Sequence, residues 1–190
     1  DHVFLVSTDG GAPRQLTFAD FDDQGPLSWT PDGKRILFSG NRHDDWQRDI
    51  NNSEVYALDL ASGSVKALTT RKGPDSAPQV SPDGKHVAYL GFDDVNRSYE
   101  NTELYVMNID GSGVKALTGS FDHSIDSIAW SGNATILAQY DDHAKTYVAR
   151  IGLDGAIRNA VEGLSPGKGY DRPYTGGEFS VSANGRIAYT

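Results

Sequence analysis

The chain has 190 residues, of which 37% are hydrophobic and 10% aromatic, so it can bury a substantial core. Its formal net charge of -9 and the lack of a basic stripe argue against nucleic acid as a partner. No apolar run approaches the roughly 20 residues that span a bilayer, which argues against a membrane partner. The absence of cysteine excludes disulfides, thiolate nucleophiles and cysteine zinc sites.

The first cycle of the chain reads as four strands separated by turns and one polar loop. Residues 3–6 are a short run of strand formers, and residues 9–11 after them are a turn signal, because glycine tolerates a positive φ. Residues 14–17 predict the returning strand. Residues 27–30 and 35–39 predict two more strands, joined at a Pro-Asp-Gly turn in which proline presets the first φ value.

This turn, Thr30-Pro31-Asp32-Gly33, recurs along the chain at a nearly fixed interval. Ser81-Pro82-Asp83-Gly84 follows 51 residues later, and a degenerate copy, Ser131-Gly132-Asn133-Ala134, begins after 50 more. Ser182-Ala183-Asn184-Gly185 follows after another 51 residues. A fixed period of this length is the mark of a repeat architecture, and the third turn should differ because its proline is missing.

Each later cycle repeats the strands of the first. Residues 55–58, 104–107 and 146–149 match the opening strand and carry a tyrosine where that strand has Phe4. Four short strands per cycle of about 40 to 50 residues are typical of β-propeller blades. No segment has the apolar period of a convincing helix, and neither a sandwich nor a solenoid explains four-stranded units of this length. We predict an all-β fold, a propeller with about four blades.

The predicted blades form one propeller segment over residues 1–190. If the strand before each Pro-Asp-Gly turn is innermost, complete blades cover about 27–69, 77–118 and 127–161, with half-blades at 1–17 and 178–190. The half-blades either pair with each other or leave open edges for self-association. Most propellers have more than four blades, so the segment is expected to be part of a larger ring. Trp29 and Trp130, on inner strands, are expected in the core.

The connections alternate between the two faces of the ring, because successive strands run antiparallel. The tight turns share one face, and the opposite face carries the long loops 40–52 and 91–101, the connection 141–145 and the links between blades. We call this second face the long-loop face. Binding groups tend to lie on loops held by a rigid scaffold, so we expect the working surface there.

The long loops concentrate acidic, histidine and aromatic side chains. The candidates for contact with a substrate or partner are His43, Asp45, Trp46, Asp94, Glu100, Asp142, His143 and Arg172. Aspartate and histidine together suit a divalent cation or an amino group, but Asp, Asn and Gly are also what exposed turns are made of. Trp46 either anchors its loop or contacts a ligand. We expect no resident metal and no cofactor.

Recognisable catalytic motifs are missing or out of context. Gly163-Leu164-Ser165-Pro166-Gly167 has the form of an α/β-hydrolase nucleophile turn, but it lies in a Gly- and Pro-rich link. Pro166 also lacks the backbone N–H that the residue after the serine gives to the oxyanion hole. We interpret it as a chance match. There is no His-Glu-x-x-His helix and no phosphate loop, so we predict no catalytic residue in this segment.

Several stretches match known propeller repeats. Residues 31–38, 103–111 and 115–118 resemble the repeats shared by the Tol-Pal protein TolB and the prolyl oligopeptidase family of serine peptidases. Residues 41–46, 52–56, 91–94 and 174–180 are similar to the acylaminoacyl-peptidase and dipeptidyl aminopeptidase branch. The resemblance covers essentially the whole chain.

The resemblance implies a propeller that precedes an α/β-hydrolase domain, caps its active site and admits only peptides or small unfolded substrates. That hydrolase domain is not among the 190 residues, so the resemblance transfers no catalytic residue. Some members hold the substrate's amino group with propeller acids, and Asp45, Asp94 and Glu100 are candidates by loop position. We expect a gating and peptide-selecting segment in a bacterial cytoplasm or periplasm. The alternatives are a TolB-like protein-interaction module and a metal- or small-molecule-binding propeller.

Overall fold

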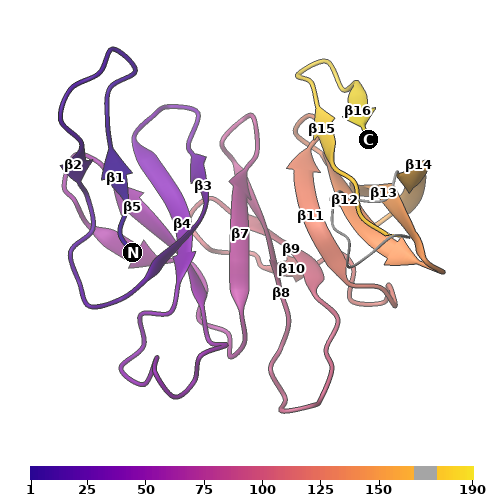
Figure 1. The fold of residues 1–190 in the computed structure, drawn as a ribbon, viewed down its shortest axis with the longest axis horizontal. Coiled ribbons are helices and arrows are strands. Elements are labelled where there is room, and N and C mark those ends of the chain that lie inside the picture. The colour runs from indigo at the N-terminus through magenta and orange to yellow at the C-terminus, as the bar shows by residue number, and fades with distance from the viewer. Residues whose placement is uncertain (165–174) are drawn as a thin grey trace.

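A computed structural model describes residues 1–164 and 175–190, and every regular element in this part of the chain is a β-strand (Figure 1). The strands are β1 (Phe4–Leu5), β2 (Arg14–Gln15), β3 (Asp23–Trp29), β4 (Arg35–Gly40), β5 (Glu54–Asp59), β6 (Val65–Ala67), β7 (Asp75–Val80), β8 (His86–Gly91), β9 (Glu103–Asn108), β10 (Lys115–Ala116), β11 (Ile125–Trp130), β12 (Thr135–Asp142), β13 (Lys145–Gly152), β14 (Ile157–Leu164), β15 (Phe179–Val181) and β16 (Ile187–Tyr189). The all-β prediction is confirmed. In the described ranges, no helix has the length and apolarity to cross a membrane.

The strands form five antiparallel sheets in chain order. The first sheet is β3-β4-β5-β6, the second is β7-β8-β9-β10 and the third is β11-β12-β13-β14. The N-terminal pair, β1-β2, and the C-terminal pair, β15-β16, are separate two-stranded sheets. Figure 1 shows the five sheets fanned out as an arc, with the two pairs at opposite ends and β3, β7, β11 and β15 along the inner side. The two pairs therefore do not complete a sheet with each other.

Three of the four related turns share one device for closing the hairpin. Thr30 Oγ1 donates to Asp32 Oδ1 at 2.6 Å, and Ser81 and Ser182 bond the corresponding Asp83 and Asn184. Gly33 has a φ of 68°, a conformation that glycine adopts without strain. The third and fourth turns are one residue shorter than the first two, because Ser131 N donates to Thr135 O and Ser182 N to Arg186 O, whereas Thr30 N reaches Arg35 O.

The core lies in the seams between neighbouring sheets, and consecutive residues of a central strand face different seams. Ile36 and Phe38 of β4 pack towards the N-terminal pair, whereas Leu37 packs with Val87 and Met107 of the second sheet. Both faces of β4 are thus buried, which explains why its sequence is continuously apolar instead of alternating. The same arrangement recurs between the second and third sheets and between the third sheet and the C-terminal pair.

The prediction that both inner-strand tryptophans are buried is right for Trp130 and wrong for Trp29. Trp130 is 9% exposed and its Nε1 donates to the carbonyl of Gln79 on β7 at 2.9 Å. Trp29, at the corresponding place on β3, is 48% exposed. The reason is that the sheet before β3 consists only of β1 and β2, so the described chain has no inner strand for Trp29 to pack on.

Replacing Trp130 with alanine should lower the free energy of unfolding by about 3–5 kcal/mol, because it leaves a cavity in the seam and removes the donor from the Gln79 carbonyl. Urea denaturation followed by circular dichroism measures the change. Val114→Ala, at an exposed position, is the control and should cost less than about 0.5 kcal/mol. Equal losses in the two variants would contradict the packing described for this seam.

Candidate functional site

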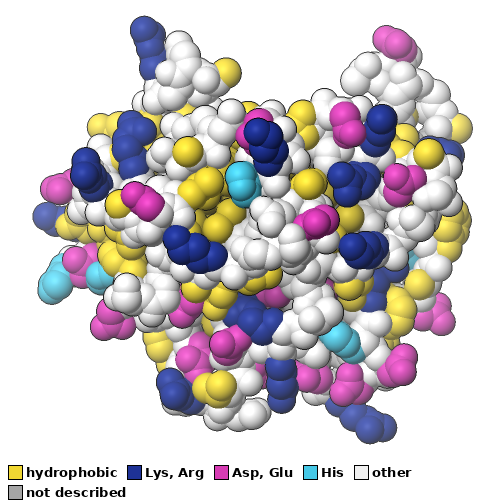
Figure 2. All heavy atoms as spheres, turned by 180° about the vertical axis from the view of Figure 1, so that it is seen from behind, with side chains coloured by type: hydrophobic (Ala, Val, Ile, Leu, Met, Phe, Trp, Pro, Cys, Tyr) yellow, Lys and Arg dark blue, Asp and Glu magenta, His cyan; other side chains and the backbone are white. Residues whose placement is uncertain are grey.

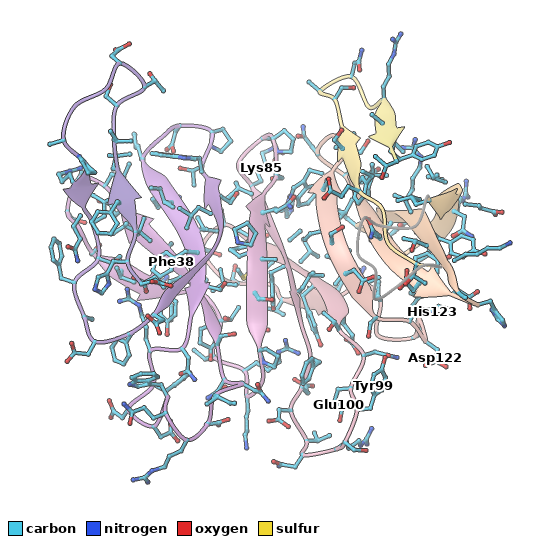
Figure 3. The ribbon with its side chains drawn as sticks, viewed as in Figure 1. Phe38, Lys85, Tyr99, Glu100, Asp122 and His123 are labelled. Atoms are coloured by element: carbon cyan, nitrogen blue, oxygen red, sulfur yellow. The ribbon has the colours of Figure 1, made fainter. Side chains whose placement is uncertain are left out.

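The long loops extend from one side of the arc. The loops between β4 and β5 and between β8 and β9 project along the lower edge of Figure 1, opposite the tight turns. In Figure 3, Lys85 marks the tight-turn side, whereas Tyr99 and Glu100 lie on the long-loop side. On the face seen in Figure 2, the described acidic and basic side chains are interspersed and do not gather into a basic stripe.

A stacked aromatic pair lies in each four-stranded sheet, between its second and third strands. The pairs are Phe38–Tyr56, Tyr89–Tyr105 and Tyr140–Tyr147, with ring centroids 5.6, 5.3 and 5.3 Å apart. In each case the two residues are direct partners in the strand register. The stacks give each four-stranded sheet a rigid aromatic layer beneath the loops.

A buried ion pair covers the stack in the first and second sheets. Arg42 lies over Phe38 and Tyr56, and its Nη2 is 2.6 Å from Asp23 Oδ1. In the second sheet Arg71 lies 4.1 Å from the Tyr105 ring centroid, bonds the Tyr105 hydroxyl at 2.7 Å and pairs with Asp75. Cation–π contact and the carboxylate together offset the cost of burying each guanidinium.

Glycine makes room for this ion pair in the second sheet. Gly91 is the register partner of Asp75, and a Cβ on it would lie 2.3 Å from Pro74 O and 2.4 Å from Arg71 Nη2. In the third sheet the corresponding partners are Ile125 and Tyr140, so neither the carboxylate nor the glycine is present. His123 occupies the covering position instead, 5.2 Å from the Tyr140 ring.

Two buried carboxylates, Glu54 and Asp75, lie where the first and second sheets meet. Glu54 is 1% exposed, accepts a hydrogen bond from Thr69 Oγ1 at 2.5 Å and lies 3.3 Å from His43 Nε2. Burial raises the pKa of Glu54, and the nearby Asp75 charge adds to the rise. Burial also raises the pKa of Asp75, against the lowering effect of Arg71. These polar groups hold the loops to the sheets.

A pocket of about 260 Å³ opens on the long-loop face beside the third sheet. It is lined by Tyr99, Asn101, Asp122, His123, Ser124, Asp126 and Asp141. Three carboxylates and no lysine or arginine line it, which favours a positively charged ligand. Figure 3 shows that Tyr99, Glu100, Asp122 and His123 gather in the same corner.

Hydrogen bonds hold the walls of this pocket together. Asn101 Nδ2 donates to Asp122 Oδ1 at 3.2 Å, and Tyr99 OH lies 3.3 Å from Ser124 Oγ. On the opposite wall Asp141 Oδ1 accepts from Thr146 Oγ1 at 2.6 Å. The loop before β9, the link before β11 and the end of β12 thus contribute side chains with fixed positions.

The structure assigns structural contacts to several of the predicted candidates. His43 bonds Glu54, and Trp46 packs edge-on against Phe21 with ring centroids 6.5 Å apart, which anchors its loop. Asp45 is exposed, and its carbonyl accepts from Arg48 N at 2.7 Å within that loop. None of these three residues lines the pocket beside the third sheet.

Of the remaining candidates, Glu100 and Asp142 are next in sequence to residues that line the pocket. Asp94 caps a turn by accepting from Asn96 N at 2.9 Å, and Glu100, between two pocket residues, lies 3.8 Å from Arg97 Nε. Asp142 pairs with His143 at 2.6 Å in the hairpin next to Asp141. Arg172 and Ser165 to Gly167 of the pentapeptide lie outside the described residues.

None of the seven residues that line the pocket was among the predicted candidates, including Asp122, His123, Asp126 and Asp141. The signal that distinguishes them is the break in the repeat, where Ile125 replaces the Asp75-type carboxylate and Tyr140 replaces Gly91. In the described ranges, no group of three or more His, Asp or Glu side chains is arranged to hold a metal ion.

Sequence comparison identifies the repeats. The model of the TolB beta propeller domain matches residues 1–167. The chain belongs to this family. Its four-stranded sheets are propeller blades, so the predicted propeller fold and the resemblance to TolB and to peptidase propellers are confirmed.

The relatives include both peptidases and TolB proteins. Dipeptidyl-peptidase 5 of Porphyromonas gingivalis is 24% identical over 177 residues, which cover 85% of this chain and 26% of that protein. The Tol-Pal system protein TolB of Francisella tularensis is 30% identical over 88 residues, 46% of this chain and 19% of TolB. The chain therefore spans about a quarter or less of the length of these curated relatives.

Solved structures show the same fold. A puromycin-hydrolyzing peptidase of Mycobacterium tuberculosis has a TM-score of 0.70 at 17% identity, over 99% of this chain and 31% of the peptidase. TolB of Acinetobacter baumannii has a TM-score of 0.68 at 22% identity, over 98% of this chain and 42% of TolB. At these identities the likeness is one of fold.

Replacing Glu54 with glutamine tests whether burial raises the pKa of this carboxylate, through the pH dependence of stability. The raised pKa means that the folded state binds this proton more tightly than the unfolded chain, so Glu54 makes the free energy of unfolding fall as pH rises above about 4.5. The stability of Glu54→Gln relative to the wild type should therefore increase with pH, up to the raised folded-state pKa. Urea titrations at a series of pH values measure it. Glu162→Gln, at an exposed strand position, is the control. The same increase in relative stability with pH in both variants, or no increase in Glu54→Gln, refutes the raised pKa of Glu54.

Proposed function

We propose that this propeller belongs to a serine peptidase and that it gates and selects peptides for a hydrolase domain. The support is the match over 85% of the chain to a dipeptidyl-peptidase and the common fold with a peptidase of which this chain covers 31%. A propeller of this kind contributes selection, and the hydrolase domain contributes the reaction. No residue of the described chain is assigned a catalytic role.

Peptide selection is assigned to the pocket beside the third blade. The amino group of a peptide is a compact cation, and three carboxylates around one cavity stabilise such a charge more than isolated surface acids do. Asp122, Asp126 and Asp141 therefore attract the amino end, while Tyr99 and His123 offer ring surfaces to the following side chain. This convergence of carboxylates is the single observation that carries the assignment of peptide selection to this pocket.

The long-loop face is proposed to meet the hydrolase domain. The tight turns are short, whereas the loop after β8, on the long-loop face, supplies Tyr99 and Asn101 to the pocket. A peptide that enters from this side meets the acids before it reaches the reaction centre. The loops thus set which peptides pass.

A titration with a small peptide tests this proposal on the chain itself. The dipeptide Ala-Phe should bind the 190-residue protein more tightly than N-acetyl-Ala-Phe, because acetylation removes the positive charge. Asp122→Asn keeps the acceptor for Asn101 but removes one charge, and we expect about fivefold weaker binding, equivalent to about 1 kcal/mol. Calorimetry at low salt measures both effects.

Asp45→Asn is the matched control, because it makes the same charge change on the same face away from the pocket. It should leave the affinity for Ala-Phe unchanged. Equal binding of the free and acetylated dipeptides, or equal loss in both variants, would contradict recognition of the amino group here.

The second candidate function is a protein-interaction module of the TolB kind. The 30% identity to TolB over 46% of the chain favours it. Such a module would not distinguish free from acetylated dipeptides. The same titration therefore separates the two candidates.

A further inference from the structure

The side chain that covers the aromatic stack has a permanent charge in two blades and a pH-dependent charge in the third. In the first and second blades it is a guanidinium, Arg42 or Arg71, paired with the buried Asp23 or Asp75. In the third blade it is the imidazole of His123. Arginine stays charged at all ordinary pH values, whereas histidine changes its charge between about pH 5 and 8.

Packing and backbone hydrogen bonds fix the position of the His123 ring. Its centroid lies 4.8 Å from that of Phe121 and 5.2 Å from that of Tyr140. His123 N donates to Phe121 O at 2.8 Å, and Phe121 N donates to Thr118 O at 2.8 Å, which ties the link to the end of the second blade. The imidazole is therefore held, partly buried, as one wall of the pocket beside the third sheet.

The charged groups that line this pocket together with His123 are all carboxylates. One comes from the link before β11, one from β11 and one from β12: Asp122, Asp126 and Asp141. The other titratable groups around the ring are the phenols of Tyr99 and Tyr140, which are ordinarily neutral in this pH range. Burial raises the pKa of Tyr140 further. A protonated His123 is thus a cation inside an acidic lining.

A proton on His123 and a cationic ligand compete for the same carboxylates. The imidazolium attracts the three acids and repels an ammonium group that enters the pocket. A neutral imidazole does neither. Because the two binding equilibria are linked, the proton and the ligand weaken each other's binding by the same factor.

We propose that His123 acts as a pH-dependent competitor in this pocket. When the imidazole is neutral, the acids hold the amino end of a peptide, and when it is protonated, they release it. This inference rests on the peptide site proposed above and adds its regulation. Arg42 and Arg71 cannot act in this way, because their charges are permanent and already paired.

The pH dependence of peptide affinity tests this inference. In calorimetry, the dipeptide Ala-Phe should bind the wild type about fivefold more weakly at about pH 5.5 than at about pH 7.2. The ligand alone predicts the opposite change, because an α-amino group, with a pKa of about 7.7–8.0, is more fully protonated at the lower pH. A loss of affinity on acidification therefore has to come from the protein.

Two histidine variants assign the effect to one residue. His123→Phe keeps a ring against Phe121 and Tyr140 but has no nitrogen that binds a proton, so its affinity for Ala-Phe should not fall on acidification. His143→Asn is the matched control, because it removes an imidazole that is 90% exposed and does not line the pocket. Asparagine also tolerates the φ of 46° at this position. This variant should keep the fivefold change.

Proton release provides a second readout that needs no variant. Because the peptide displaces the proton from His123, binding at about pH 6 should release protons to the buffer. The measured heat of binding should then depend on the ionisation enthalpy of the buffer. No release by the wild type contradicts the competition. If circular dichroism shows that His123→Phe is unfolded, this measurement decides.

The outcomes separate this inference from the function on which it rests. If Ala-Phe does not bind at neutral pH, the proposed peptide site and its regulation are both overturned. If Ala-Phe binds with the same or higher affinity at the lower pH, only the role of His123 is overturned. The same holds if folded His123→Phe loses affinity on acidification as the wild type does.

Discussion

The fold depends on one constraint, that each blade is apolar on both faces and must be covered by a neighbour on each side. Ile36 and Leu37 are consecutive residues, and they belong to two different seams. A single blade of this sequence would expose both of these apolar faces to water. The order of the chain follows directly, because each new sheet covers the previous one, and stability builds up seam by seam, as in other repeat proteins. The exposure of Trp29 is the same constraint seen where a covering strand is missing.

An arginine–aspartate pair covers the aromatic stack in the first two blades, and the candidate site lies in the third blade, where this pair is absent. In the first two blades an arginine and a buried aspartate seal the aromatic stack, and Gly91 leaves the space that the second pair needs. In the third blade Ile125 and Tyr140 stand where the carboxylate and the glycine were. His123 covers the ring there, and acids from the link before β11, from β11 and from β12 line an open pocket. The pocket thus lies in the blade that lacks the arginine–aspartate pair.

The sequence predicted turns and strands well, but it predicted poorly which residues from distant segments meet in the pocket. Turns such as Thr30 to Gly33 are set by residues within one hairpin, so their spacing was enough to count strands and blades. The pocket brings together Tyr99 from the loop before β9, Asp122 from the link before β11 and Asp141 from the end of β12, and no spacing in the sequence encodes that meeting. His43 and Trp46 were sensible candidates by composition, but Glu54 and Phe21 use them to hold a loop. The burial of Trp29 was predicted wrongly because it depends on a neighbour, not on its own strand.

The difference between the tight-turn face and the long-loop face follows from the way the turns and the buried ion pairs are built. The tight turns are closed by their own side chains, as Thr30 closes on Asp32, so that face has little surface left for recognition. The long-loop face is held by buried charges, and Glu54 and Asp75 have raised pKa values because burial disfavours their charged forms. Charges already balanced in this way are poor ligands for a substrate. The acids that line the third-blade pocket have no lysine or arginine beside them in that lining, and for that reason we propose that the positively charged end of a peptide binds there.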